Sequence, residues 1–336
     1  MELDSILSPV QGDLTHFDEK LRLNLNSYSR LISQVAGHLV NRKGKRLRPA
    51  MVFLSYGLCK GTDSESPKPD AGLVSNHQVM NVALAVELIH TATLLHDDVV
   101  DQSKVRRGQV SVNHKWSNLV SVLMGDFLLA KALRLLVETE SPALLSTISK
   151  ATVNLSVGEM SEAQETHNFD LDEKTYLEII SAKTASLFTA SCEAGAVAAG
   201  ADRKNQKMLR EYGQNLGMAF QITDDLLDWV GETEKTGKGL GTDLKEGKIT
   251  LPLIHTLKEC DPSTRKKIIR LLENDFNQKG FTLILSLMKG NGGVDYARKK
   301  AGAFGRKALT CVSEFTDSEH KRALQDLISF VIKREK

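Results

Sequence analysis

Two copies of the acidic pattern Asp-Asp-x-x-Asp are the residues in this sequence most suited to chemistry. They are Asp97-Asp98-x-x-Asp101 and Asp224-Asp225-x-x-Asp228. The first and last aspartates of each copy are four residues apart, so their carboxylates lie on one face of a helix, one turn apart. Grouped carboxylates repel one another unless a cation lies between them, and such hard oxygen ligands favour Mg²⁺, which shares its coordination shell with substrate phosphates. The spacing therefore indicates a diphosphate ligand.

Basic residues near the first motif support an anionic ligand. Arg106 and Arg107 follow this motif closely, and Lys45, Arg46 and Arg48 form a second cationic group upstream. Guanidinium groups bind phosphate oxygens through two parallel hydrogen bonds. A single acidic pair is often no more than a solvated helix face. The second copy, however, lies in an apolar segment, where carboxylates are costly unless they bind something.

Helices are the elements expected to position these residues. A three-to-four-residue apolar period leads to the first motif, at Leu84, Leu88, Ala92, Leu95 and Val99. This period is typical of a helix with a buried face, and strand signals are nearly absent. Segment 61–76 predicts a surface loop, and Asp261-Pro262 predicts a helix start.

Composition excludes several classes of protein. The net charge is +2 and the pI about 8.2, so nothing indicates nucleic-acid binding. The cysteines are scattered without a C-x-x-C pattern, which fits reduced thiols and neither a disulfide framework nor a zinc site, at Cys59, Cys192, Cys260 and Cys311. No positively charged segment followed by an apolar one opens the sequence, so we expect no signal peptide, and charges interrupt every apolar stretch before spanning length. We therefore expect a cytoplasmic protein.

Together these motifs resemble the trans (E) polyprenyl diphosphate synthases, chain-elongating prenyltransferases with the isoprenoid synthase fold. The resemblance covers nearly the whole chain, with the elements in the family's order at 44–49, 90–101, 106–108, 125–126, 158–159, 183–187, 224–228 and 237–248. It implies an all-α fold, with residues 1–336 forming a single helical bundle around a central cavity. It also implies a homodimer with at most peripheral membrane contact for product release.

The resemblance assigns a role to each site residue. Metal binding, by about three Mg²⁺ ions, is expected at Asp97, Asp101, Asp224 and Asp228, the last through bound waters, with support from Asp98 and Asp225. Isopentenyl diphosphate is expected at Lys45, Arg48, His90 and Arg107. The allylic diphosphate primer is expected at Arg106, Lys183, Thr184, Gln221, Lys238 and Lys248. Asp243 is placed within reach of a metal-bound water, and His96 is expected to be structural.

Two further features concern the lid and the product. Glycines between 231 and 247 predict a flexible lid that brings Lys238 and Lys248 to the phosphates, although a solvated loop position is the alternative for both lysines. In this family, a bulky residue four or five positions before the first motif stops chain growth. Thr93 and Ala92 occupy these positions, which predicts an open tunnel and a long-chain product for quinone side chains. Ordinary helix packing is the alternative for Ala92.

Other functions remain as alternatives. A farnesyl or geranylgeranyl diphosphate synthase would share every motif. A non-catalytic partner subunit of a heteromeric synthase should have lost part of the metal or arginine set, which this chain retains. A terpene cyclase would replace the second motif. A di-iron bundle needs two Glu-x-x-His patterns, and only Glu87-x-x-His90 occurs.

Overall fold

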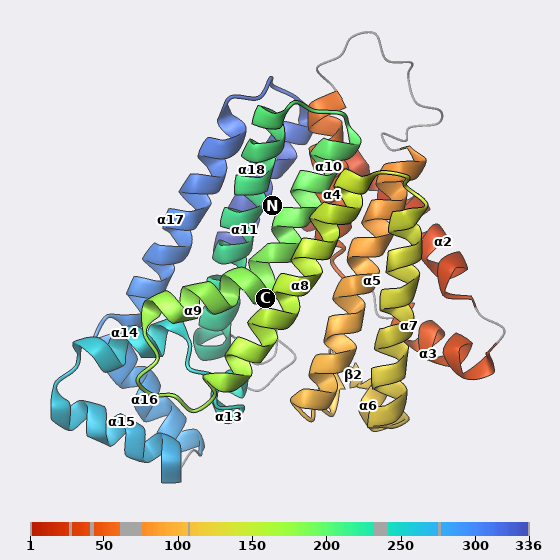
Figure 1. The fold of residues 1–336 in the computed structure, drawn as a ribbon. Coiled ribbons are helices and arrows are strands. Elements are labelled where there is room, and N and C mark those ends of the chain that lie inside the picture. Colours follow the sequence, from red (N-terminus) through yellow and green to blue (C-terminus); the bar gives the residue numbers. More distant parts are fainter. Residues whose placement is uncertain are drawn as a thin grey trace. The chain divides into compact units, whose positions relative to one another are not determined.

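The computed structural model describes residues 2–26, 29–40, 44–60, 76–106, 108–231, 241–274 and 277–334. Nearly all of these residues lie in helices, and one two-stranded hairpin is the only sheet among them (Figure 1). The prediction of an all-α protein is therefore confirmed.

The contacts within the chain divide it into two compact units. The first unit comprises Met1–Val153, Leu187–Gly213 and Leu309–Phe330, and the second comprises Asn154–Ser186, Gln214–Ala308 and Val331–Lys336. Each unit is thus assembled from separated stretches of sequence. The interpretation of residues 1–336 as a single domain stays a prediction.

The first unit contains the N-terminal helices and parts of later ones. They are α1 (Leu3–Ile6), the 3₁₀-helix η1 (Ser8–Val10), α2 (Gln11–Leu25), α3 (Arg30–Val40), α4 (Leu47–Lys60), α5 (His77–Val100), α6 (Val112–Lys115), α7 (Asn118–Val137), the first part of α8 (Pro142–Gln164), α10 (Ser186–Ala198), the first part of α11 (Arg203–Val230) and most of α18 (Glu319–Lys333). α5 and α7 lie side by side (Figure 1). The predicted apolar period is buried at Leu84, Leu88, Ala92 and Leu95.

α5 begins with a side-chain cap and is unusually apolar. The Asn76 side chain accepts a hydrogen bond from the Val79 backbone nitrogen at 3.1 Å, as an N-cap residue does. By length and composition this helix is able to cross a membrane, contrary to the expectation that charges interrupt every long apolar stretch. However, 72% of its most apolar window is buried inside the protein, as in the core helix of a globular domain.

A short hairpin follows α5 in the same unit. Strands β1 (Val105–Arg106) and β2 (Gln109–Val110) pair antiparallel, with Val105 opposite Val110. Gly108 has a φ of +73°, a left-handed conformation that glycine adopts without steric cost and that tight hairpin turns require. The turn fixes the position of Arg106 at the end of β1.

The second unit contains the helices around the second motif. They are the rest of α8, α9 (Glu173–Ile180), the π-helix η3 (Ser181–Ala185), the second part of α11, α13 (Thr242–Lys245), α14 (Leu251–Glu259), α15 (Pro262–Asn274), α16 (Gln278–Gly290) and most of α17 (Gly293–Ser313). Trp229 stacks on Phe281 in its core, with ring centroids 5.3 Å apart. α15 starts at Pro262 as predicted, and Asp261 caps it. Of the predicted surface loop 61–76, residues 61–75 lie outside the described residues, so the loop stays a prediction.

Candidate active site

The first aspartate motif ends α5, and its three aspartates differ in burial. Asp97 and Asp101 are half-buried, whereas Asp98 is only 1% exposed. The Asp98 carboxylate accepts a hydrogen bond from Nε of Arg106 at 2.5 Å, and its backbone oxygen accepts one from the Asn113 side chain at 2.8 Å. Asp98 therefore holds Arg106, while the other two aspartates stand nearer to solvent.

His96, expected to be structural, packs against α7. Its Nε2 lies 3.2 Å from the Val122 carbonyl oxygen and 3.6 Å from the Asp126 carboxylate. A Cβ atom on Gly125 would lie 2.2 Å from the His96 ring. The Gly125-Asp126 pair is thus explained by a close approach between α5 and α7.

The basic residues at the start of α4 fall into two groups. Lys45 is exposed and lies 5.5 Å from the Phe330 ring, and the Arg48 guanidinium lies 4.7 Å from the Phe188 ring. Arg46 instead turns inward and pairs with Asp18 and Glu87.

Arg46 is therefore structural and does not belong to the cationic group that the sequence suggested. The ion pair with Arg46 also explains why Glu87 is buried, at 6% exposed, and no iron site is needed to explain it. His90 is half-buried on α5, and Arg107 lies outside the described residues.

The two residues expected to control chain length also lie on α5. Ala92 is fully buried. Thr93 is half-buried, and its hydroxyl donates to the His90 carbonyl oxygen at 2.8 Å. Neither side chain is bulky, so both remain candidates for the wall of a product tunnel.

The second aspartate motif lies near the end of α11, in the second unit. Asp224 is exposed, Asp228 is half-buried and Asp225 is 3% exposed. Burial raises the pKa of the Asp225 carboxyl to about 7, although hydrogen bonds from Tyr176 and Gln221 oppose the shift. As in the first motif, the middle aspartate is the buried one.

Asp228 binds the start of α13. One carboxylate oxygen accepts from the Thr242 backbone nitrogen at 3.0 Å and the other from the Asp243 nitrogen at 3.2 Å. Gly241 precedes this helix with a φ of +71°, and its nitrogen donates to the Asp228 carbonyl oxygen. This capping brings Asp243 next to the motif, where burial and the Asp228 carboxylate raise the pKa of its side chain.

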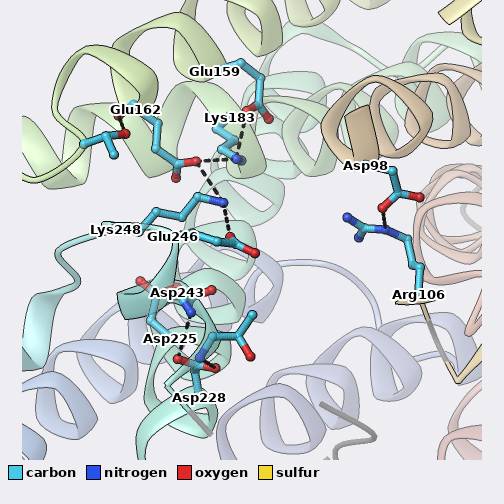
Figure 2. Close-up of polar contacts among 12 residues, drawn as sticks. Asp98, Arg106, Glu159, Glu162, Lys183, Asp225, Asp228, Asp243, Glu246 and Lys248 are labelled. Carbon is cyan, nitrogen blue, oxygen red and sulfur yellow. Dashed lines mark hydrogen bonds and ion pairs between the residues drawn. The ribbon is translucent and has the colours of Figure 1, made fainter. Parts of the chain in front are cut away.

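Lys183 and Thr184 project from the π-helix, a local irregularity that is frequent at functional sites. The Lys183 ammonium donates to Glu159 at 2.8 Å and to Glu162 at 2.6 Å (Figure 2). Both glutamates come from α8, which approaches closely because Gly158 has no side chain. A Cβ atom there would lie 2.4 Å from the Lys183 backbone nitrogen.

Lys248 joins the same cluster from the segment after α13. Its ammonium lies 2.7 Å from Glu246 and 3.7 Å from Glu162 (Figure 2). Its backbone nitrogen donates to the Asp243 carbonyl oxygen at 2.8 Å. Of the two lysines predicted on the lid, Lys248 lies in the cluster that contains Lys183 and Glu162, whereas Lys238 lies outside the described residues.

The remaining predicted residues of this unit form a hydrogen-bond chain. The Thr184 hydroxyl donates to Gln221 at 2.7 Å, and Gln221 donates to Asp225 at 2.7 Å. The other Asp225 oxygen accepts from the Tyr176 hydroxyl at 2.5 Å. Thr184 and Gln221, both assigned to the allylic diphosphate from the resemblance, are thus hydrogen-bonded to each other, and Tyr176 is an addition.

Arg334, near the C-terminus, contacts the first aspartate of the second motif. Its guanidinium donates to the Asp224 carboxylate at 2.7 Å and to the Phe220 carbonyl oxygen at 3.2 Å. It also stacks on the Phe220 ring at 4.0 Å, and the side chain is only 6% exposed. Arg334 therefore holds one oxygen of Asp224 in place.

The donor set of both motifs fits a hard divalent cation, because it offers carboxylate oxygens and no soft ligand. Among the described residues, no three His, Cys, Asp or Glu side chains converge closely enough to hold an ion by themselves. Mg²⁺ is usually held by one or two carboxylates and completes its shell with water and substrate phosphates. The arrangement therefore fits a metal that binds together with its substrate.

Comparisons with known proteins agree with this chemistry. The polyprenyl synthetase family model matches residues 29–284. An octaprenyl diphosphate synthase from Haemophilus influenzae is 34% identical over 334 residues, which cover 99% of this chain and 98% of the relative. Component 2 of heptaprenyl diphosphate synthase from Geobacillus stearothermophilus is 32% identical over the full length of both chains. The chain belongs to the polyprenyl synthetase family, and it is a prenyltransferase.

A solved structure supports the fold. The crystal structure of a polyprenyl synthase from Caulobacter crescentus, complexed with calcium and isoprenyl diphosphate, has a TM-score of 0.91. It is 37% identical and covers 100% of this chain and 98% of its own. The predicted isoprenoid synthase fold is confirmed, and that relative was crystallised in complex with a divalent cation, calcium.

Several site residues were missed by the sequence reasoning. Glu159 was noted only as part of a motif, and a spacing of three residues to Glu162 on a helix was a usable signal for a paired acidic face. Tyr176 and Arg334 had no signal, because they lie 49 and 110 residues from the aspartates that they contact.

Proposed function

We propose that the protein elongates an allylic diphosphate by successive head-to-tail condensation with isopentenyl diphosphate. The product is a long-chain all-trans polyprenyl diphosphate that serves as a precursor of quinone side chains. The full-length similarity to octaprenyl and heptaprenyl diphosphate synthases supports the length. The absence of a bulky side chain at Ala92 and Thr93 agrees with it.

One observation carries the proposal most directly. In the second unit, Lys183, Lys248 and the aspartate motif belong to one continuous network through Glu162, Asp243 and Asp228. The network thereby groups cationic side chains that bind phosphate oxygens with carboxylates that bind a cation. An allylic diphosphate with its metal requires both. Glu159, Glu162 and Glu246 hold the two ammonium groups, and diphosphate oxygens replace these carboxylates as partners when substrate binds.

The reaction follows from charge. Arg106, Lys183 and Lys248 bind the allylic diphosphate and stabilise the charge that develops on it as the allylic C–O bond breaks. Isopentenyl diphosphate is held by Lys45, Arg48, His90 and Arg107. Its double bond attacks the allylic carbon, a new C–C bond forms, and a proton passes to the departing diphosphate. The product is five carbons longer, and no nucleophilic side chain takes part.

The metal in this proposal is Mg²⁺, with about three ions bound together with the diphosphate. Its direct ligands are Asp97, Asp101 and Asp224, and Asp228 acts through bound waters. When bound, the metal neutralises the departing diphosphate. Asp98 and Asp225 keep their neighbours in position.

The protein acts as a homodimer in this proposal. α7 is apolar on two faces, because Met124, Leu128 and Leu135 are buried. Large apolar side chains are exposed along the other face, at Leu119, Val122, Leu123, Leu133 and Val137. Large apolar side chains exposed together on one helix face indicate an interaction site, and a symmetric dimer is the commonest form of homo-oligomer. A cytoplasmic location with at most peripheral membrane contact completes the proposal.

A single assay tests the function. The purified protein is incubated with Mg²⁺, isopentenyl diphosphate and an allylic primer, and the dephosphorylated products are separated by chain length. Long-chain products from the protein alone are expected. Farnesyl or geranylgeranyl products would favour the shorter-chain alternative.

Turnover only after a second subunit is added would favour the partner-subunit alternative. This outcome is tested because one relative is named component 2 of a heptaprenyl diphosphate synthase. Omission of the metal, with a chelator present, is the control and should abolish turnover.

A further inference from the structure

Tyr176 is a buried tyrosine whose hydroxyl points at the second aspartate motif. It lies on α9 with its ring in the apolar core of the second unit, and the residue is 4% exposed. Its hydroxyl donates to Oδ2 of Asp225 at 2.5 Å. Burial and the neighbouring Asp225 carboxylate raise the pKa of Tyr176 far above its usual range, so the hydroxyl keeps its proton and acts as a donor.

This hydrogen bond is the first link of a chain of hydrogen bonds. The Gln221 side chain donates its NH₂ group to Oδ1 of Asp225 at 2.7 Å. The Gln221 oxygen then faces Thr184, whose hydroxyl donates to it at 2.7 Å. Both oxygens of Asp225 are thus occupied by donors from two different helices.

The chain connects three elements whose relative positions matter for diphosphate binding. Tyr176 belongs to α9, Asp225 and Gln221 belong to α11, and Thr184 belongs to the π-helix. Lys183 precedes Thr184 on this π-helix, and Asp224 precedes Asp225 on α11. The network therefore fixes the helix that carries the lysine against the helix that carries the exposed aspartate.

We propose that Tyr176 is a positioning residue for the allylic diphosphate, acting through Asp225 and Gln221 on Thr184 and Lys183. The inference rests on the proposed function for the identity of the substrate. Loss of one hydroxyl leaves a buried carboxylate oxygen without its donor, which is costly in a low-dielectric interior. Asp225 and Gln221 then reorient, and the spacing between Lys183 and the motif relaxes.

The test uses Tyr176→Phe, which removes only the hydroxyl. Inorganic diphosphate with Mg²⁺ is titrated into the full-length protein by calorimetry, and steady-state kinetics are measured for both substrates. We expect the Kd for diphosphate and the KM for the allylic substrate to rise about tenfold, as for the loss of a hydrogen bond to a charged group. The KM for isopentenyl diphosphate should change less than about twofold.

Tyr212→Phe is the matched control. Tyr212 lies on α11, is fully buried, and donates its hydroxyl to the Leu324 carbonyl oxygen at 2.7 Å. This variant removes the same group from an interior site in the first unit. It should lower thermal stability to a similar extent without changing diphosphate binding.

A double-mutant cycle separates positioning from general destabilisation. Thr184→Val removes the hydroxyl at the far end of the network, where Asp225 and Gln221 stand between Tyr176 and Thr184. If the network transmits the effect, the double variant should lose less binding than the product of the two single losses. If Tyr176→Phe does not fold, Gln221→Met removes the middle link and should weaken diphosphate binding to the same extent.

Two results would overturn the inference. One is unchanged diphosphate binding in Tyr176→Phe, and the other is strict additivity in the cycle with a stability loss like that of Tyr212→Phe. Failure of the proposed function would give a different result. The wild-type protein would then produce no prenyl diphosphate, although Tyr176→Phe would still bind inorganic diphosphate more weakly than the wild type.

Discussion

At the scale of single residues, the two aspartate motifs have the same arrangement of buried and accessible carboxylates. In each motif the middle aspartate is almost fully buried, and its carboxylate holds a neighbouring side chain, Arg106 for Asp98 and Gln221 for Asp225. On a helix, adjacent residues point about 100° apart. The middle side chain therefore turns inward when the first and last face the ligand, which supports the assignment of Asp98 and Asp225 as supporting residues.

The first prediction concerns the outer aspartates. Asp97→Ala or Asp224→Ala should lower turnover by two to three orders of magnitude, or about 3 to 4 kcal/mol of transition-state stabilisation, because each removes a carboxylate that binds the metal with its diphosphate. Steady-state kinetics at saturating Mg²⁺ measure the loss. Asp295→Ala, which removes an exposed aspartate on α17, is the control and should retain most turnover. Near-normal rates in either outer-aspartate variant would remove the two-motif mechanism.

A second prediction separates the two phosphate sites. Lys45→Ala and Arg48→Ala should mainly raise the KM for isopentenyl diphosphate, whereas Arg106→Ala and Lys183→Ala should impair binding and ionisation of the allylic substrate. His90→Ala should resemble the first pair with a weaker effect. Varying one substrate at saturation of the other gives both constants. A rise in the allylic KM for the first pair instead would reverse the assignment of sites.

At the scale of elements, the site depends on close approaches between helices that only small residues permit. The third prediction tests one of them. Gly158→Ala should lower the free energy of unfolding by about 1 to 3 kcal/mol, because its Cβ atom would overlap the backbone of the π-helix. The displaced Lys183 should also bind diphosphate more weakly. Chemical denaturation and calorimetry provide the two readouts.

Gly37→Ala is the matched control for this substitution. Gly37 lies inside α3, and a Cβ atom there meets no other atom within 4 Å. Alanine should therefore stabilise the protein, by about 0.5 to 1 kcal/mol. A neutral Gly158→Ala variant would mean that α8 and the π-helix separate easily and that the close approach is not needed.

The fourth prediction concerns α5 as the wall of the product tunnel. Ala92→Phe should shift the main product to farnesyl or geranylgeranyl diphosphate while the first condensation persists, because the ring fills space that the next isoprene unit needs. Thr93→Phe should act similarly but closer to the reacting carbon. Ala85 lies two helical turns before Ala92 and is also fully buried, so Ala85→Phe should stop growth at a longer product. Chromatography of the dephosphorylated products decides, and an unchanged profile in all three variants would mean that the tail takes another path.

At the scale of the whole molecule, the exposed apolar side chains of α7 carry the proposal of a homodimer. The fifth prediction is that Leu123→Glu or Leu133→Glu converts a dimer to a monomer, since each places a charge in the centre of an apolar contact. Light scattering at micromolar concentration measures the mass. Leu23→Glu, on an exposed leucine of α2, should leave the dimer intact. A wild-type protein that is monomeric at this concentration would contradict the proposed assembly.

The sequence by itself determined the chemistry of the ligand and the all-α class. Both depend on local information, because residue types at helical spacing specify carboxylates on one face and the period of apolar residues specifies a helix. The resemblance to the family assigned Thr184 and Gln221 to the same substrate, but their hydrogen bond is a finding of the structure. The basic run alone did not separate Arg46, which pairs inside with Glu87, from Lys45 and Arg48. Only the resemblance to the family left Arg46 out of the substrate site.

Only the tertiary structure decided which side chains support the site. Tyr176, Glu162 and Arg334 reach the second motif or its lysines from segments far away in sequence. The π-helix and the missing side chain of Gly158 set the approach of α8 to Lys183. These features arise from packing between segments that are distant in sequence. Such contacts have no period along the chain, so local sequence patterns cannot predict them.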